Sequence, residues 1–225
     1  MNKYRTLKFI QQNITSLRPS DTRKMLNHFL NTNQIDIALL QEIWIKSNEH
    51  YSFPGYKFQK SLRPTGYGGV GILVKNGIKF DDFVLPKLSP LETIAIKTLN
   101  TEKELLIISI YIPPSPIRNQ DIKEPLIKLL EIIEKSNLPT VLAGDFNAHN
   151  LIWNPSHSNC PRGELIEKLI ENTEFVIMND GCPTLIKAPN TIPSAIDLTL
   201  ISKDISHKVD WKVINEEICS NHKLI

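Results

Sequence analysis

Residues 144–147, Gly-Asp-Phe-Asn, place a carboxylate and an amide directly after the apolar run 138–143. A buried strand read from that run brings Asp145 and Asn147 to its carboxyl end. Because residues two apart along a strand point to the same side, both side chains are expected to face one site. A carboxylate that moves a proton or binds a metal ion, beside an amide that binds a phosphate oxygen, fits phosphodiester hydrolysis. Taken alone, Asp-x-Asn after a strand is more often a turn.

Polar residues of the same kind stand at the ends of other apolar runs. The runs 8–10, 35–40 and 105–110 lead to Gln11-Gln12-Asn13, Gln41-Glu42 and Tyr111; Asp197 begins the run 198–201, and His222 stands near the C-terminus. So many polar residues at strand ends favour one shared site over many unrelated turns.

Three amphipathic helices are expected to position these residues. Residues 22–31 have helical apolar spacing, with Ser20 or Asp21 as the N-cap. Residues 121–135 place apolar side chains on one face, with Pro125 in the first turn, where a missing N–H costs little. A third apolar stripe, at 165–170, follows Gly163.

The strands are expected to form two mixed sheets. The β-rich runs are 69–75, 93–98, 104–112, 140–143 and 197–202. Residues 95–99 and 105–109 are predicted to form a hairpin. Strands and helices intermix without strict βα alternation, which favours an α/β fold with two mixed sheets packed face to face and helices outside.

Composition bounds the class of protein. The chain has 225 residues, 41% hydrophobic and 22% charged, with no repeat or linker, so residues 1–225 are predicted to form one domain. A net charge of +2 requires any DNA-binding face to be a local patch. Three widely spaced cysteines indicate a reducing compartment, and no apolar run is long enough to span a membrane.

The ordered motifs resemble a known family. They are Asn13, Gln41-Glu42, Gly68-Gly69-Val70, Tyr111 with Pro113-Pro114, Gly144-Asp145-Phe146-Asn147, Ser194-Ala195-Ile196-Asp197 and Ser220-Asn221-His222. This set is similar to the endonuclease/exonuclease/phosphatase superfamily, over about residues 8–225. The segment 147–150 with Trp153, Arg162-Gly163, and the segments 178–184 and 196–200 are similar to endonuclease domains of non-LTR retrotransposons, above all the insect Jockey, R1 and I-type elements.

The resemblance implies a four-layered α/β sandwich with the site at one edge. The resembled fold has one more strand after the segment that ends at Ile225. We therefore expect the chain to be a fragment of a longer polypeptide or a truncated copy. It also implies a Mg²⁺-dependent DNA endonuclease that nicks duplex DNA and leaves a 3′-hydroxyl and a 5′-phosphate. That nick would prime a reverse transcriptase region of the same polyprotein, in the nucleus.

Glu42 is the expected metal ligand, since a strand-end carboxylate suits hard Mg²⁺, and Mn²⁺ is expected to substitute. The resemblance gives Asn13 a place in the shell of this metal. Tyr111 is expected to bind or orient the phosphate, although a tyrosine before Pro-Pro also packs well in a core.

His222 is the candidate for activating water, because imidazole titrates in the useful range. The resemblance makes Asp197 its partner and leaves Asp145 to assist proton transfer and Asn147 to bind a phosphate oxygen. Family mechanisms differ over whether the aspartate or the histidine acts on the water. His149 is expected to line the DNA groove.

Asn221 departs from the family pattern, which has aspartate before this histidine, close to the metal. An asparagine keeps the shape and removes one negative charge, so weaker metal binding is expected. Two alternatives remain open: a phosphatase or phospholipase of the same fold, and a catalytically decayed copy that only binds DNA.

Overall fold

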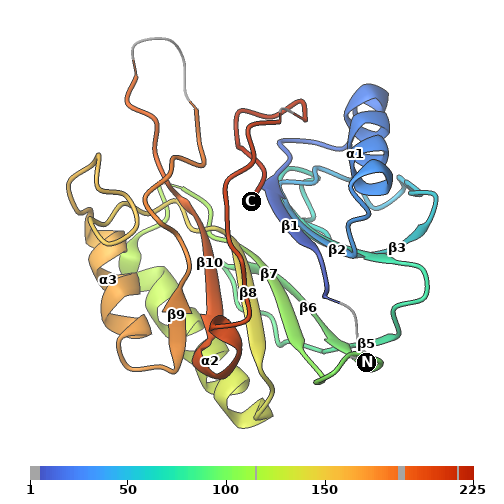
Figure 1. Ribbon diagram of the computed structural model, residues 1–225. Coiled ribbons are helices and arrows are strands. Elements are labelled where there is room, and N and C mark those ends of the chain that lie inside the picture. The colour runs from blue at the N-terminus through green and yellow to red at the C-terminus, as the bar shows by residue number, and fades with distance from the viewer. Residues whose placement is uncertain (1–5, 115, 187–190, 217) are drawn as a thin grey trace.

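The computed structural model of the protein (Figure 1) describes residues 6–114, 116–186, 191–216 and 218–225. Its strands form two sheets, of four and six strands. The strand order is β1-β2-β4-β3 in the first sheet and β5-β6-β7-β8-β10-β9 in the second. Both sheets mix parallel and antiparallel pairs, as the irregular alternation of strands and helices predicted.

The first sheet is built from strands whose carboxyl ends carry polar residues. Its members are β1 (Phe9–Asn13), β2 (Ile37–Gln41), β3 (Tyr56–Ser61) and β4 (Val70–Lys75). β1 and β2 run parallel, with Asn13 opposite Gln41, so these two polar residues end the sheet together. At the free edge of β1, Ile225 exchanges two backbone hydrogen bonds with Gln11, at 3.0 and 3.1 Å.

The second sheet contains the run that precedes Asp145. Its strands are β5 (Phe80–Asp82), β6 (Glu92–Thr98), β7 (Leu106–Tyr111), β8 (Thr140–Asp145), β9 (Phe175–Ile177) and β10 (Asp197–Ser202). The predicted hairpin is confirmed, because β6 and β7 pair antiparallel. β8 lies between β7, parallel, and β10, antiparallel, so its end is flanked on both sides.

Apolar packing arranges the elements in four layers (Figure 1). The sheets pack face to face through aliphatic residues such as Ile37, Ile72 and Ile107. Helix α1 (Ser20–Thr32) packs on the outer face of the first sheet through Leu26 and Leu30. α2 (Asn119–Ser136) and α3 (Pro161–Ile170) cover the outer face of the second sheet. The short α4 (Lys203–Ser206) follows β10. The predicted α/β sandwich is confirmed.

The predicted helices form with shifted beginnings. In α1 the N-cap position belongs to Pro19, not to Ser20 or Asp21, and no side chain caps it. α2 begins at Asn119, two residues earlier than predicted, so Pro125 lies in the second turn instead of the first. An apolar stripe fixes the buried face of a helix, whereas its first turn depends on local bonds that the stripe does not report.

Two expectations from composition concern membranes and cysteines. No helix in the described ranges is long and apolar enough to cross a membrane. Cys160, Cys182 and Cys219 are free.

Candidate functional site

The second sheet brings three predicted residues to one edge. Asp145 ends β8, Tyr111 ends the neighbouring β7, and Asp197 begins β10 on the other side. The strand registers set Asp145 opposite both Tyr111 and Asp197. The polar residues thus meet because neighbouring strands terminate at the same level.

The first sheet supplies Asn13 and Glu42 to the same place. Asn13 Nδ2 donates to Glu42 Oε1 and to Asp145 Oδ2, both at 2.9 Å. One buried amide therefore joins a carboxylate that follows the first sheet to a carboxylate of the second. Asn13 Oδ1 accepts from the backbone N–H of Thr15 at 3.1 Å, which fixes the orientation of the amide.

Glu42 is held in a strained turn. Its φ is +52°, and those of Trp44 and Asn147 are +50° and +48°. Residues other than glycine seldom adopt this left-handed backbone conformation. Trp44 Nε1 donates to Glu42 Oε2 at 3.1 Å, so both carboxylate oxygens have partners. Backbone strain of this kind gathers at sites where the surrounding structure enforces it.

Asp197 and His222 form a buried pair. His222 Nδ1 lies 2.9 Å from Asp197 Oδ2 and 3.1 Å from Oδ1. Thr184 Oγ1 donates to Asp197 Oδ2 at 2.6 Å, and Gln11 Nε2 donates to Oδ1 at 3.3 Å. The aspartate is thus fixed from three sides, and it in turn orients the imidazole through Nδ1.

Burial and charge perturb the titration of three groups. Burial lowers the pKa of His222, but the charge and hydrogen bond of Asp197, together with the charges of Asp145 and Glu42, outweigh this and raise it to about 9. Burial raises the pKa of Asp145, and the charge of Asp197 raises it further, against the opposing effect of His222. Burial, with Glu42 and Asp145, raises the pKa of the Tyr111 hydroxyl, which stays protonated at neutral pH.

Two acidic groupings could hold a metal ion. Ligand atoms of Asp145, Asp197 and His222 lie within 4.8 Å of one another. Glu42 and Asp145 form the second grouping, because both accept from one amide nitrogen of Asn13, and oxygen ligands of this kind fit a hard divalent cation.

Asn147 reaches the site differently from the prediction. β8 ends at Asp145, and the positive φ of Asn147 places it in a turn beyond the strand, so strand alternation does not orient it. Its backbone N–H donates to Asp145 Oδ1 at 2.9 Å, and its Nδ2 donates to the carbonyl of Ile112 at 3.1 Å. The Asp-x-Asn pattern therefore forms a turn, as such patterns usually do, and this turn lies beside the Asp145 carboxylate.

His149 and Asn221 contact residues outside this network. His149 Nδ1 is 2.6 Å from Asn154 Nδ2, and its ring stacks on His157 with centroids 4.6 Å apart. The side chain of Asn221 is exposed, and its backbone carbonyl accepts from Ile186 at 2.9 Å.

Several residues that support the site had no predicted role. Thr184 and Gln11 hold Asp197, and Gln41 donates to Ser109 Oγ at 2.9 Å between the sheets. Arg162 is buried beside Asn147. Gln11 and Gln41 adjoin strand-end motifs, and Thr184 and Arg162 stand within segments already recognised. Their bonds span up to 186 residues of sequence, so no spacing rule reports them.

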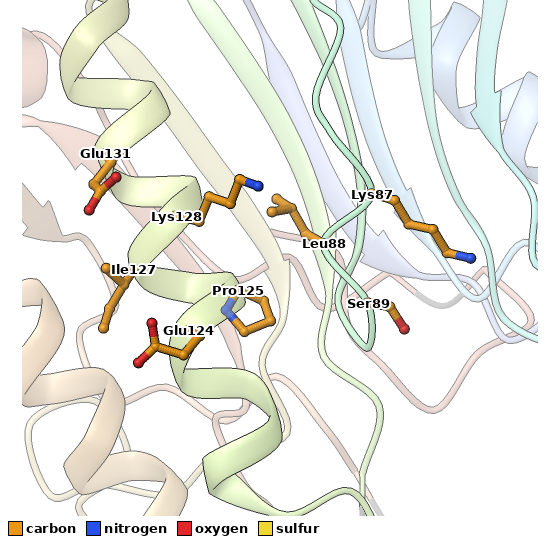
Figure 2. Close-up of a pocket in the computed structure, with 8 residues that line it drawn as sticks. All are labelled: Lys87, Leu88, Ser89, Glu124, Pro125, Ile127, Lys128 and Glu131. Carbon is orange, nitrogen blue, oxygen red and sulfur yellow. The ribbon is translucent and has the colours of Figure 1, made fainter.

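Two hollows of the surface lie away from this group of residues. Figure 2 shows one of about 420 Å³ between Leu88 and the exposed side of α2. A larger one, of about 1210 Å³, lies near the C-terminal ends of α2 and α3 and includes Pro139 and Phe175. Neither is lined by any of the predicted site residues.

Comparisons with known proteins identify relatives of this chain. A protein-family model described as endonuclease-reverse transcriptase matches residues 105–225. The RNA-directed DNA polymerase from the mobile element jockey of Drosophila funebris is 23% identical over 200 residues, 88% of this chain and 21% of that protein. The probable RNA-directed DNA polymerase from the transposon X-element of Drosophila melanogaster is 28% identical over 164 residues, 69% of this chain and 17% of that protein.

Solved structures show the same fold. The endonuclease domain of TRAS1, a telomere-specific non-LTR retrotransposon, superposes with a TM-score of 0.79 at 20% identity, covering 97% of this chain and 96% of that one. The AP endonuclease LMAP from Leishmania major gives 0.79 at 16% identity, covering 97% and 86%.

The chain spans about a fifth of the length of the polymerases that it matches. The family model covers more than half of the chain, and the matching relatives and the fold point the same way. The chain therefore belongs to the endonuclease-reverse transcriptase family, within the endonuclease/exonuclease/phosphatase superfamily.

Proposed function

We propose that this chain is a metal-dependent endonuclease that hydrolyses a phosphodiester of duplex DNA and leaves a 3′-hydroxyl and a 5′-phosphate. One observation carries the proposal: strand ends of both sheets, the turns that follow them and the C-terminal segment bring seven polar residues to one place. These are Asn13, Glu42, Tyr111, Asp145, Asn147, Asp197 and His222. Carboxylates, an imidazole and amides are the groups that phosphodiester hydrolysis requires.

Mg²⁺ is the proposed cofactor, with Mn²⁺ as a substitute. Glu42 would hold it, because carboxylate oxygens are the ligands that hard cations prefer. Asn13, whose amide nitrogen donates to Glu42 Oε1 and to Asp145 Oδ2, would orient that ligand. When bound, the ion would supply neutralisation of charge on the phosphate. The neutral side chain of Asn221 adds no charge to this group, so we propose a weakened affinity for the cation.

His222 is proposed to donate a hydrogen bond to the phosphate. Its pKa of about 9 makes the ring an imidazolium at neutral pH, with Nδ1 held by Asp197 and Nε2 left for the substrate. A protonated ring cannot accept a proton from water. This protonation state favours stabilisation of the charge that develops on the phosphate over the water activation expected from the sequence.

Asp145 is then the group that moves a proton. Its raised pKa brings it closer to neutral pH, where a carboxyl group exchanges protons most effectively. Tyr111 stays protonated and donates its O–H, and Asn147 binds a phosphate oxygen through its amide. His149 is proposed to line the DNA groove, beyond the reacting group.

An aromatic and cationic patch beside Glu42 supports a DNA substrate. Tyr67 is 56% exposed, and the guanidinium of Arg18 lies 5.2 Å from the centre of its ring. Trp44, which donates to Glu42, packs edge-on against Tyr67 with centroids 5.3 Å apart. Positive charge attracts the phosphate backbone, and exposed aromatic rings contact sugars and bases.

The proposed setting is a retrotransposon polyprotein that acts in the nucleus. The relatives are RNA-directed DNA polymerases of mobile elements, and the alignment with the jockey protein uses 21% of its length. A reverse transcriptase region in the same polyprotein would extend the 3′-hydroxyl left by the nick.

Nicking of supercoiled plasmid tests the proposal. The protein is incubated with increasing Mg²⁺ or Mn²⁺, with EDTA and a His222→Ala protein as controls. Metal-dependent relaxation that is lost in His222→Ala supports a nuclease, and a ligatable 3′-hydroxyl at the nick supports the proposed polarity.

Other outcomes identify the alternatives. Binding of plasmid without cleavage by the original protein, but cleavage by Asn221→Asp, identifies a decayed copy. Absence of nicking by both proteins, with hydrolysis of inositol phosphates or sphingomyelin in liposomes, identifies a phosphatase or phospholipase of the same fold.

A further inference from the structure

Arg162 is a buried cation without a carboxylate partner. It is 7% exposed, and no ion pair involves it among the described residues. Its guanidinium donates only to backbone carbonyls: Nη1 to Pro113 at 2.9 Å and to Asn147 at 3.4 Å, and Nη2 to Ile117 at 3.2 Å. Burial of an unpaired charge is costly, so retention of an arginine here calls for a role.

These carbonyls belong to the two loops that carry Tyr111 and Asn147. The first loop follows β7, and Ile112 in it accepts the side-chain amide of Asn147 at 3.1 Å. The second is the turn after β8 in which Asn147 has its positive φ. Arg162 therefore holds Asn147 directly through its carbonyl and indirectly through the segment that receives its side chain.

The first residues of α3 pack against the backbone of His149, two residues after Asn147. Cys160 Sγ accepts from the backbone N–H of His149 at 3.3 Å, and Cys160 N–H donates back to the His149 carbonyl at 2.9 Å. A Cβ on Gly163 would lie 1.9 Å from that carbonyl, so only glycine permits this approach. The segment 147–149 is thus fixed by three residues around the start of α3: Cys160, Arg162 and Gly163.

We propose that Arg162 is a positioning residue for phosphodiester cleavage, which sets the place of Asn147 through the loop carbonyls that it binds. The inference rests on the proposed function. A planar guanidinium can donate to three carbonyls at fixed angles, whereas the ammonium of lysine keeps the charge without that geometry. Arg162→Lys therefore separates the positioning from the charge.

Nicking kinetics of four proteins test this: wild type, Arg162→Lys, Asn147→Ala and the double variant. Arg162→Lys is expected to lower the rate at saturating DNA by on the order of 100-fold with little change in KM, because small displacements of a positioned group have effects of that size. In the Asn147→Ala protein, the same change is expected to cost only a few-fold more, since the group that it positions is absent. Arg118→Lys is the matched control, because Arg118 is an exposed arginine that pairs with Asp121.

Hydrogen exchange gives a second readout that needs no activity. Faster exchange of the backbone amides in 146–150 is expected in Arg162→Lys, with α1 unchanged; unchanged exchange in 146–150 overturns the inference even if the wild type fails to nick DNA. Wild-type nicking rates in Arg162→Lys, a raised KM at constant rate, or losses that multiply in the double variant also overturn it. If Arg162→Lys does not fold, Arg162→Gln, which keeps a planar donor, is compared in the same way.

Discussion

Replacement of Asp197 by asparagine removes the charge that keeps His222 protonated while preserving the shape of the side chain. The folded protein raises the pKa of His222 from 6.5 to about 9, which corresponds to roughly 3 kcal/mol of preferential stabilisation of the imidazolium. Burial acts in the opposite direction and lowers that pKa. Without the carboxylate, burial is opposed only by the charges of Asp145 and Glu42, so the pKa of His222 in Asp197→Asn is expected to fall well below 9.

The same change alters how stability depends on pH. A folded-state pKa above the unfolded value means that the folded protein holds the proton more tightly. The charged pair therefore contributes its full stability below pH 6.5 and loses it as the pH rises through about 9. In EDTA, the free energy of unfolding of the wild type is expected to fall by roughly 3 kcal/mol across this range from His222 alone. Asp197→Asn removes that contribution, so the difference between the two proteins shrinks as the pH rises.

Two measurements check this reasoning in the metal-free protein. An NMR titration of the imidazole nitrogens gives the pKa of His222 directly, with His222→Gln used for assignment. Urea denaturation at a series of pH values gives the free energy of unfolding of wild type and Asp197→Asn. A His222 pKa that stays near 9 in Asp197→Asn would refute the argument. A constant stability difference from pH 6.5 to about 9 would contradict the assignment of that pH dependence to this pair.

Three further substitutions test other parts of the structure. Glu42→Gln removes a proposed metal ligand, and plasmid nicking is expected to fall by about 100-fold while circular dichroism is unchanged. Asn221→Asp adds a negative charge, and the Mg²⁺ concentration for half-maximal nicking is expected to fall by roughly 10-fold, as a Mg²⁺ titration would show. Gly163→Ala places a methyl group against the His149 carbonyl, and the free energy of unfolding in urea is expected to fall by about 1–3 kcal/mol. An unchanged midpoint of the urea denaturation curve would contradict the close packing of α3.

The interior strands and the helices could be predicted because their apolar patterns are local. β10 begins and ends at the predicted residues 197–202, and β4, β6 and β8 lie within two residues of their predicted runs. The three strands that were missed, β3, β5 and β9, are all at sheet edges. β3 and β5 bury less of their surface and carry polar side chains, so their sequences resemble loops. β9 is apolar but only three residues long.

The site shows a similar division. Strand-end position and family resemblance pointed to Asn13, Glu42, Tyr111, Asp145 and Asp197. The register of the second sheet brings the last three together, and hydrogen bonds of Asn13 join the first two to Asp145. Sequence did not indicate which atoms bond. The orientation of Asn13 toward two carboxylates, and the protonation of His222, arise from tertiary contacts and burial that no local pattern encodes.

The left-handed conformations of Glu42, Trp44 and Asn147 have a consequence for how this protein can evolve. Glycine at any of them would relax the backbone by about 1 kcal/mol, so more stable versions of these turns are one substitution away. Each such change would delete a side chain of the site: the Glu42 carboxylate, the Trp44 indole that donates to it, or the Asn147 amide that donates to the Ile112 carbonyl. Selection for stability therefore favours glycine at these three positions, whereas selection for cleavage favours the present side chains. In a copy that is no longer selected for cleavage, we expect glycine to accumulate there.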